Sequence, residues 1–305
     1  MKKLSIIILT GALWVLTLGL NAQMLKPYTI GAIADGTVME VTKQVESELK
    51  SAGFEVLGSY MPIDDNNRMV VTFTSSGLKS AVSKVGGLTG FALAWRVAVT
   101  KEDNGVIVSY NTPAYWGNAY FTKKYNKVKD VYMEYDNKIS SALANVGSGG
   151  GAQFGSEKGL EEERLQRYRY KVLMPQFDDT QVIAKFDSYA DAIGTIDRNL
   201  KNGVAELTEV YAVEMADKKL KLYGIGLSGE DGEGKFMPKI DISSPKHTAF
   251  LPYEILVVDN KVHMLHGRFR IALSFPDLSM GTFMKIVSTP GDIKDLMETA
   301  CKSES

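Results

Sequence analysis

Hydrophobic and polar positions alternate most regularly between Leu88 and Phe121. The larger apolar residues of this alternation are Phe91, Leu93, Trp95, Val97 and Val99, and the residues between them are Ala92, Ala94, Arg96 and Ala98. Successive side chains of a strand point to opposite faces, so the pattern predicts a strand with one bulky apolar face and one face of mostly alanine. Asn104–Gly105 predicts a hairpin turn into a second strand, and Pro113 is expected to open an aromatic loop after it.

Helical periodicity flanks this hairpin on both sides. Residues 37–52 carry an apolar stripe at Val38, Val41, Val45 and Leu49, and residues 123–146 carry one at Val128, Tyr132, Tyr135, Ile139, Ala142 and Val146. Short strands are predicted near 25–33, 54–63 and 69–74, and a further helix begins at Ser75 or Ser76. The order β-α-β-β-α-β-β-α predicts an α+β domain in which helices pack on an antiparallel sheet.

The same plan recurs in the second half of the chain. Leu93, Trp95, Val97 and Val99 recur as Leu251, Tyr253, Ile255 and Val257, each 158 residues later. The helix expected before this second core strand is poorly defined, because its segment is rich in glycine and contains Pro238. We therefore predict two similar α+β domains, at 23–147 and 168–305, and a flexible glycine-rich linker at 148–167.

The N-terminus has the pattern of a secretory signal. Lys2 and Lys3 precede an apolar run from Leu4 to Leu20, which is followed by Asn21 and Ala22. We predict a signal peptide over residues 1–22, export to the periplasm or the extracellular space, and no stable membrane insertion after cleavage. An uncleaved anchor is the alternative, because Leu20 at the −3 position is only a fair fit to the cleavage rule, although the run is shorter than a membrane span needs.

Composition and charge narrow the classes of partner. Of 305 residues, 45% are hydrophobic, and 35 basic residues nearly balance 36 acidic ones. This composition excludes a disordered chain, and the absence of a basic excess argues against nucleic acid as a partner. Cys301 is the sole cysteine, so no internal disulfide supports the fold.

Several short motifs of the chain resemble the DUF302 family, also called TT1751-like. They are Gly53-Phe54-Glu55-Val56-Leu57, Leu93 to Val99, Asn104-Gly105 and Pro113, with Leu251-Pro252-Tyr253 in a second copy. The resemblance spans about 29–146 and, more weakly, 182–300, and it implies tandem small α+β domains without an agreed function. Many members carry a cysteine beside the core strand. Trp95 and Tyr253 stand there instead, so no thiol or metal role is carried over.

An aromatic cluster gives the candidate ligand site. Tyr115, Trp116 and Tyr120 follow the core hairpin, and Trp95 and Arg96 lie on its first strand. Tyrosine and tryptophan suit a pocket because they combine a large apolar surface with a polar tip, and arginine can hold an anionic head group. The alternative is that these aromatic residues pack the core or the contact between domains.

Arg96 and Glu254 occupy equivalent positions in the two copies, opposite the bulky core residues. A charge in the middle of a strand is usually solvated. The alternative hypothesis is that the domains pack with pseudo-twofold symmetry and that these two residues face one another.

Motifs for catalysis are weak. His247, His263 and His266 lie close in sequence to Asp241 and Glu254, a composition suited to a metal, although His263 and His266 are expected on opposite strand faces. Gly224–Gly229 matches GxGxxG, but acidic residues follow it, and no cofactor is expected. We therefore predict a non-catalytic binding protein for a small amphiphile or a protein partner. The alternative is a metal-dependent hydrolase that uses the second-domain histidines.

Overall fold

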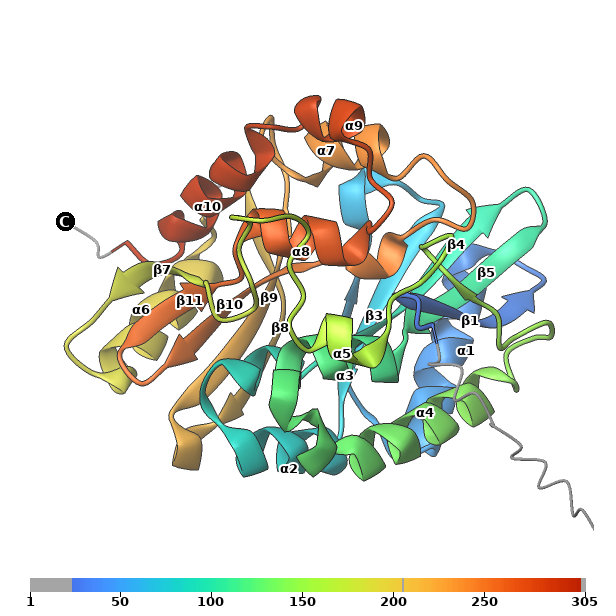
Figure 1. Cartoon of the computed structure of the whole chain (residues 1–305), viewed down its shortest axis with the longest axis horizontal. Coiled ribbons are helices and arrows are strands. Elements are labelled where there is room, and N and C mark those ends of the chain that lie inside the picture. Colours follow the sequence, from blue (N-terminus) through green and yellow to red (C-terminus); the bar gives the residue numbers. More distant parts are fainter. Residues whose placement is uncertain (1–23, 205, 303–305) are drawn as a thin grey trace, which may run out of the picture.

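The computed structural model describes residues 24–204 and 206–302, which form a mixed α+β structure with two antiparallel sheets (Figure 1). The first sheet has the strand order β2-β3-β4-β5-β1-β6. Its strands are β1 (Tyr28–Ala34), β2 (Glu55–Tyr60), β3 (Arg68–Thr74), β4 (Trp95–Glu102), β5 (Gly105–Asn111) and β6 (Gln153–Phe154). The predicted core strand is β4, which lies inside this sheet between β3 and β5.

The second sheet has the strand order β7-β11-β10-β9-β8. Its strands are β7 (Gln181–Lys185), β8 (Leu207–Met215), β9 (Leu220–Leu227), β10 (Tyr253–Val258) and β11 (Lys261–Met264). The second predicted core strand, β10, is again central.

The two halves share one strand order. When the strands of each half are numbered from one to five along the chain, both sheets have the order 2-3-4-5-1. This order is β2-β3-β4-β5-β1 in the first sheet and β8-β9-β10-β11-β7 in the second. Each half also has an irregularity in its first and second strands. The residues skipped in the pairing are Gly31 of β1 and Leu57 of β2, and Ile183 of β7 and Val210 of β8. Bulges add a residue at a fixed register position, so their agreement supports equivalence of the halves.

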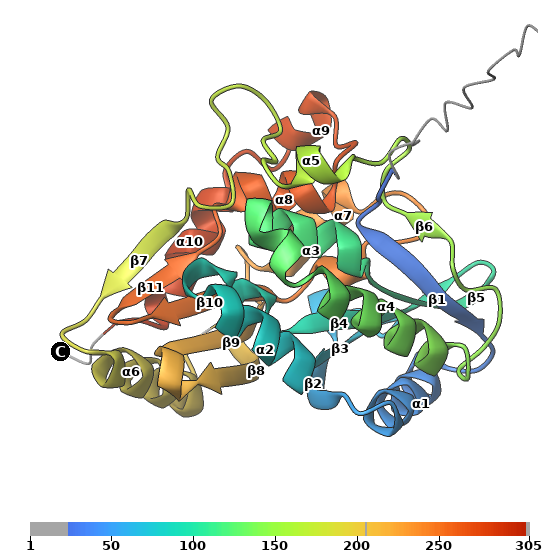
Figure 2. The same ribbon diagram turned by 60° about the horizontal axis from the view of Figure 1, so that its bottom comes forward.

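The helices pack mainly on the outer faces of the sheets. They are α1 (Val38–Ser51), α2 (Ser76–Val85), α3 (Pro113–Phe121), α4 (Lys129–Leu143), α5 (Glu162–Leu165), α6 (Tyr189–Asn202), α7 (Glu233–Ile240), α8 (Gly267–Ser274), α9 (Met280–Met284) and α10 (Thr289–Thr299). Figure 2 shows α1, α2 and α4 close together along one side of the first sheet. On the second sheet, Ile196 of α6 and Ile293 of α10 share a core with Ile255. Within the described residues, no helix is long and apolar enough to span a membrane. The predicted signal peptide lies outside the described residues.

Local sequence explains where α1 begins and which face it buries. The Thr37 hydroxyl accepts a hydrogen bond from the Glu40 amide at 3.2 Å, and the Glu40 carboxylate accepts one from the Thr37 amide at 2.9 Å. This reciprocal capping box satisfies amide donors that the first turn leaves free. The predicted stripe of α1 is buried.

The inner faces of the sheets pack against each other, with reciprocal contacts from the 3-10 turns before β4 and β10. Thr248, in the turn before β10, pairs its hydroxyl with that of Thr100 on β4 at 2.9 Å. Gly90, in the turn before β4, lies so close to Leu256 of β10 that a Cβ there would be 2.7 Å from the leucine side chain. The two halves therefore contact through equivalent elements, as pseudo-twofold packing requires.

Three expectations about local structure were wrong. The aromatic loop after Pro113 is α3, because proline at the first helical position is pre-shaped for a helix. The poorly defined segment contains α7 despite Pro238, since Phe236, Met237 and Ile240 are buried and supply tertiary packing. The expected flexible linker includes β6, which pairs with β1, and it carries the buried Leu160 and Leu165. The proposed domain boundaries stay a prediction.

Candidate functional site

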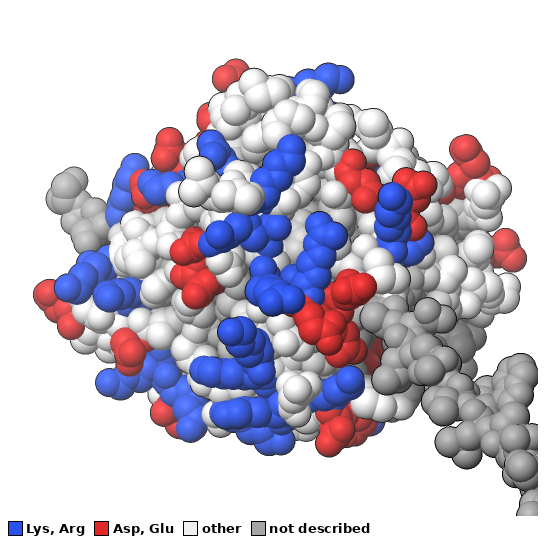
Figure 3. Space-filling model, in the orientation of Figure 1, with Lys and Arg blue, Asp and Glu red and all other residues white. Residues whose placement is uncertain are grey.

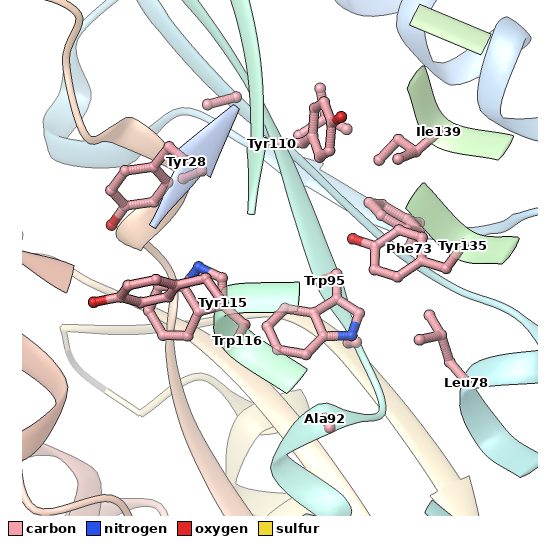
Figure 4. Close-up of a cluster of buried hydrophobic side chains, with 14 of the residues drawn as sticks. Tyr28, Phe73, Leu78, Ala92, Trp95, Tyr110, Tyr115, Trp116, Tyr135 and Ile139 are labelled. Carbon is pink, nitrogen blue, oxygen red and sulfur yellow. The ribbon is translucent and has the colours of Figure 1, made fainter. Parts of the chain in front are cut away.

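The five residues predicted to bind a ligand are all buried. Their exposed fractions are 1% for Trp95, 3% for Arg96, 0% for Tyr115, 3% for Trp116 and 1% for Tyr120. Trp95 stacks on Tyr120 with ring centroids 5.6 Å apart. Figure 4 shows Trp95 beside Trp116, and the centroids of these two rings are 6.1 Å apart. Trp116 donates its indole N–H to the Pro27 carbonyl at 2.7 Å. In this structure the cluster packs the core, which was the alternative interpretation, and a ligand at these side chains is untested.

The cluster also reaches the second half of the chain. Tyr115 on α3 donates its hydroxyl hydrogen to the Leu273 carbonyl on α8 at 2.7 Å. Tyr120 stacks on Phe177, which lies just before the second sheet. These contacts tie the two halves together through fully buried aromatic rings, so their energetic role is inter-half packing.

Arg96 and Glu254 face one another, as the less favoured hypothesis for these two residues stated. The Arg96 Nη2 atom lies 2.5 Å from Glu254 Oε1, and both side chains are buried. The Arg270 Nη1 atom, on α8, lies 2.9 Å from Glu254 Oε2. The Tyr211 hydroxyl donates a hydrogen bond to Glu254 Oε1 at 2.5 Å. One carboxylate thus pairs with two buried guanidinium groups. Sequence reasoning missed Arg270, because nothing in its local pattern marks it as buried.

A second buried carboxylate, Glu233, lies between the halves at the start of α7. Its oxygens accept hydrogen bonds from the Leu227 amide at 3.2 Å and the Tyr60 hydroxyl at 3.2 Å. The Ile63 amide also donates to it, at 3.4 Å, from a turn in which Ile63 has a φ of 53°. Burial raises the pKa of the Glu233 carboxyl to about 7, and the hydrogen bonds oppose that rise only in part.

We expect this carboxyl to make stability depend on pH. Its pKa in the fold, about 7, lies above the usual value of 4.5, so between these values the folded protein binds a proton that the unfolded chain does not. Stability therefore falls as pH rises through this range, by about 3 kcal/mol from this group alone. Urea unfolding of the wild type and of Glu233→Gln, at about pH 5 and about pH 8, measures how the free energy of unfolding depends on pH. Glu233→Gln should make stability depend less on pH, whereas the exposed control Glu55→Gln should not. An equal pH dependence in wild type and Glu233→Gln would contradict the assignment of this effect to Glu233.

Gly224–Gly229, the GxGxxG match, is not followed directly by a helix. Its first four residues are the end of β9, which stops at Leu227, and α7 begins four residues after Gly229, at Glu233. The buried Glu233 carboxylate already lies at this helix start, where a dinucleotide would place its phosphates. The geometry therefore gives the motif no role in binding phosphate.

The three histidines lie in different settings. His247 is buried and stacks on Phe275 with centroids 4.5 Å apart, and its Nδ1 lies 3.1 Å from the Ser274 carbonyl. His263 on β11 pairs with the Thr180 hydroxyl, and His266 caps α8. Burial lowers the pKa of all three imidazoles, which favours their neutral forms. Across residues 24–204 and 206–302, no group of three or more His, Cys, Asp or Glu side chains is placed to hold a metal ion.

A cavity of about 410 Å³ with a mixed polar and apolar lining lies beside His247. Its walls include Ser156, Asp277 and Ser279 together with apolar residues such as Phe154 and Phe275. The Asp277 carboxylate is already engaged, because it accepts hydrogen bonds from the Glu157 amide at 2.5 Å and the Ser156 hydroxyl at 3.3 Å. No residue of this cavity is set up as an activated nucleophile in these contacts.

An apolar groove of about 280 Å³ adjoins that cavity and shares Phe275 and Leu278 with it. Its apolar walls come from α8, α9 and the residues around them, and they include Met174, Ile271, Met280, Phe283, Met284 and Val287. Met280 and Met284 are 49% and 58% exposed, an unusual amount for large apolar side chains. Sequence reasoning missed this groove.

The charged residues that line the groove have one sign. Lys171 and Arg268 are its charged lining residues, and none of the described residues that line it is acidic. A groove of this kind can accommodate a hydrocarbon chain and hold an anionic head group at the rim, because arginine and lysine both bond carboxylates or phosphates.

Comparison with known proteins gives a partial structural likeness. No family model matches the chain, and no curated protein matches it. A solved structure described as uncharacterized conserved protein DUF302 from Bacillus stearothermophilus is 13% identical, with a TM-score of 0.34. The match covers 41% of this chain and 99% of that one. At this TM-score the likeness carries no argument about function, and the α+β fold stands on the sheets themselves. The chain is thus similar to a DUF302 structure over less than half of its length.

Proposed function

We propose that this protein binds a small anionic amphiphile, without catalysis, in the apolar groove between α8, α9 and residues 170–174. The observation that carries the proposal is the groove itself, apolar along its walls with Lys171 and Arg268 as its charged residues. Its volume of about 280 Å³ is at the lower end of ordinary ligand sites, which suits a short chain. The aromatic residues that the sequence suggested for this role are buried elsewhere.

The chain of the amphiphile would lie against the methionine-rich wall. Methionine is flexible and polarisable, so it adapts to ligands that differ in length or branching. The head group would lie near Arg268, which is exposed and makes no ion pair with any described residue. An unpaired guanidinium loses little by turning to a ligand carboxylate.

Two further predictions stay proposals. We regard the halves as divergent copies of one DUF302-like unit, a view supported by their common strand order and matched strand irregularities. Export rests on residues 1–22 alone, and the mass of the protein from its host, starting at Gln23 or at Met1, distinguishes cleavage from retention.

Decanoate binding tests the groove. We expect Met284→Asp to weaken decanoate binding by roughly tenfold or more, because a carboxylate in the wall repels the ligand and disfavours its chain. Met133→Asp is the matched control, since Met133 on α4 is 56% exposed and does not line the groove. Isothermal titration gives the affinities, and equal loss in both variants, or in neither, would contradict the proposal.

The sign of the head group is tested at Arg268. Arg268→Glu should weaken decanoate by roughly tenfold and improve binding of decyltrimethylammonium relative to wild type. Lys43→Glu, on the exposed face of α1, should change neither affinity. If the preference for decanoate over decyltrimethylammonium is the same in wild type and Arg268→Glu, the head group binds elsewhere.

A further inference from the structure

A basic segment with an apolar tip lies next to the groove. Between Arg164 and Lys171, exposed cations alternate with buried or half-buried side chains. The exposed cations are Arg164, Arg167, Arg169 and Lys171. Tyr168 and Tyr170 point inward and donate their hydroxyl hydrogens to the Ala272 and Leu278 carbonyls, at 2.8 and 3.1 Å. The two tyrosines thus anchor the segment on α8 and on the turn between α8 and α9, and they leave the cations outward.

The tip follows immediately after these cations. Val172 and Leu173 are 85% and 94% exposed, far more than large apolar residues normally are. Leu173 also has a φ of 69°, a conformation that a branched residue rarely adopts. Two adjacent apolar side chains presented this fully to solvent, next to cations, suggest a site that is covered in use.

Other cations continue the basic surface. The turn before α4 exposes Lys123, Lys124 and Lys127. Its neighbour Lys129 lies 3.5 Å from Glu162 of α5, which places this turn beside the basic segment. Figure 3 shows Lys and Arg gathered in a band down the middle of this face, with Asp and Glu toward its sides. Near the segment the exposed acids are Glu161, Glu163, Asp178 and Asp179.

We propose that this face docks on an anionic lipid bilayer, with Val172 and Leu173 inserted at the interface. A bilayer offers both features that the segment requires, a negatively charged surface for the cations and hydrocarbon just beneath it for the tip. An acidic protein surface would match the cations but leave the apolar pair uncovered. Docking of this kind is reversible and differs from stable insertion. It does not depend on whether the groove holds an amphiphile.

Co-sedimentation with vesicles tests the proposal. The whole protein is mixed with vesicles of equal parts phosphatidylglycerol and phosphatidylcholine, or of phosphatidylcholine alone, and all variants keep the same N-terminus. We expect binding to the anionic vesicles that weakens as salt rises. Arg167→Glu with Arg169→Glu should reduce it by roughly 25-fold or more, since each cation near the surface contributes about fivefold. Val172→Ser with Leu173→Ser should reduce it by roughly a hundredfold or more, because the change removes about five apolar carbons and each inserted CH₂ contributes roughly fourfold in affinity.

Matched controls separate this surface from the groove. Lys43→Glu with Lys50→Glu, on α1, should leave vesicle binding unchanged, and the two Arg-to-Glu replacements should leave decanoate affinity in solution nearly unchanged. Equal binding to neutral vesicles, or binding that the Arg variant retains, would overturn the proposal. Retention of wild-type binding by the Val172→Ser, Leu173→Ser variant would overturn insertion of the tip. Binding to polyglutamate without binding to vesicles would assign the face to an acidic protein.

Discussion

Glu254→Gln is expected to destabilise the protein by about 3–5 kcal/mol, a large effect for so conservative a change. The carboxylate is buried and compensates two buried guanidinium groups, with contacts of 2.5 Å to Arg96 and 2.9 Å to Arg270. An amide cannot balance their charge, so both cations would remain buried without a counterion. Urea unfolding at neutral pH measures the loss directly.

An exposed ion pair provides the control. Glu55 pairs with Lys79 at 2.7 Å, and its side chain is 57% exposed, so Glu55→Gln should cost under about 1 kcal/mol. A double-mutant cycle on Arg96→Ala and Glu254→Ala should show coupling on the order of 0.5–3 kcal/mol. A cost for Glu254→Gln as small as that of the control, together with no coupling, would mean that the halves do not meet as described.

Trp116→Ala is expected to destabilise the protein by about 3–5 kcal/mol. The indole is buried among aromatic rings, with centroids 6.1 Å from Trp95 and 5.7 Å from Tyr120, and its N–H is bonded to Pro27. Truncation would leave a large cavity and remove one of the two hydrogen bonds that the Pro27 carbonyl accepts, the other coming from the Thr112 amide at 3.0 Å. Trp116→Phe keeps most of the ring and should cost less, mainly the lost hydrogen bond and the smaller volume. Calorimetric melting measures both, and an unchanged melting temperature for Trp116→Ala would show that the residue is not a core residue.

Periodicity predicted those parts of the fold in which burial follows one simple pattern. The stripe of α1 and the alternation along β4 each identify a buried face without knowledge of the rest of the chain. Because register fixes the face of every strand residue, the same alternation placed Arg96 and Glu254 opposite the bulky side chains. A symmetric pairing of the two copies then predicts their contact.

Other features depend on tertiary context that a sequence pattern does not carry. The segment Pro113–Phe121 is apolar all round, so periodicity could not distinguish a buried helix from an aromatic loop. α7 forms around Pro238 because its other residues are covered by neighbouring elements. Glycine-rich composition suggested flexibility at 148–159, yet the glycines allow close approach to β1, where Gly151 donates to the Ile30 carbonyl at 2.7 Å.

The candidate site was the least predictable part. The groove joins residues 170–174 to residues 268–287, and neither segment alone has an apolar pattern that marks a ligand site. The aromatic cluster carried the strongest local signal, but bulky aromatic residues mark cores as readily as pockets. The fold buries the aromatic cluster and leaves the groove open, so only the structure distinguishes a core cluster from a ligand site.

Methionine methyl NMR with decanoate locates the ligand directly. Of the 13 methionines in the sequence, Met174, Met280 and Met284 line the groove. Met39 on α1 and Met133 on α4 lie outside the groove and are about as exposed as Met280 and Met284. With methyl-labelled methionine, we expect saturable shifts at the three groove methyls and none at Met39 or Met133. Shifts spread evenly over all exposed methionines, or no shift at the groove methyls while decanoate binds, would contradict binding in the groove.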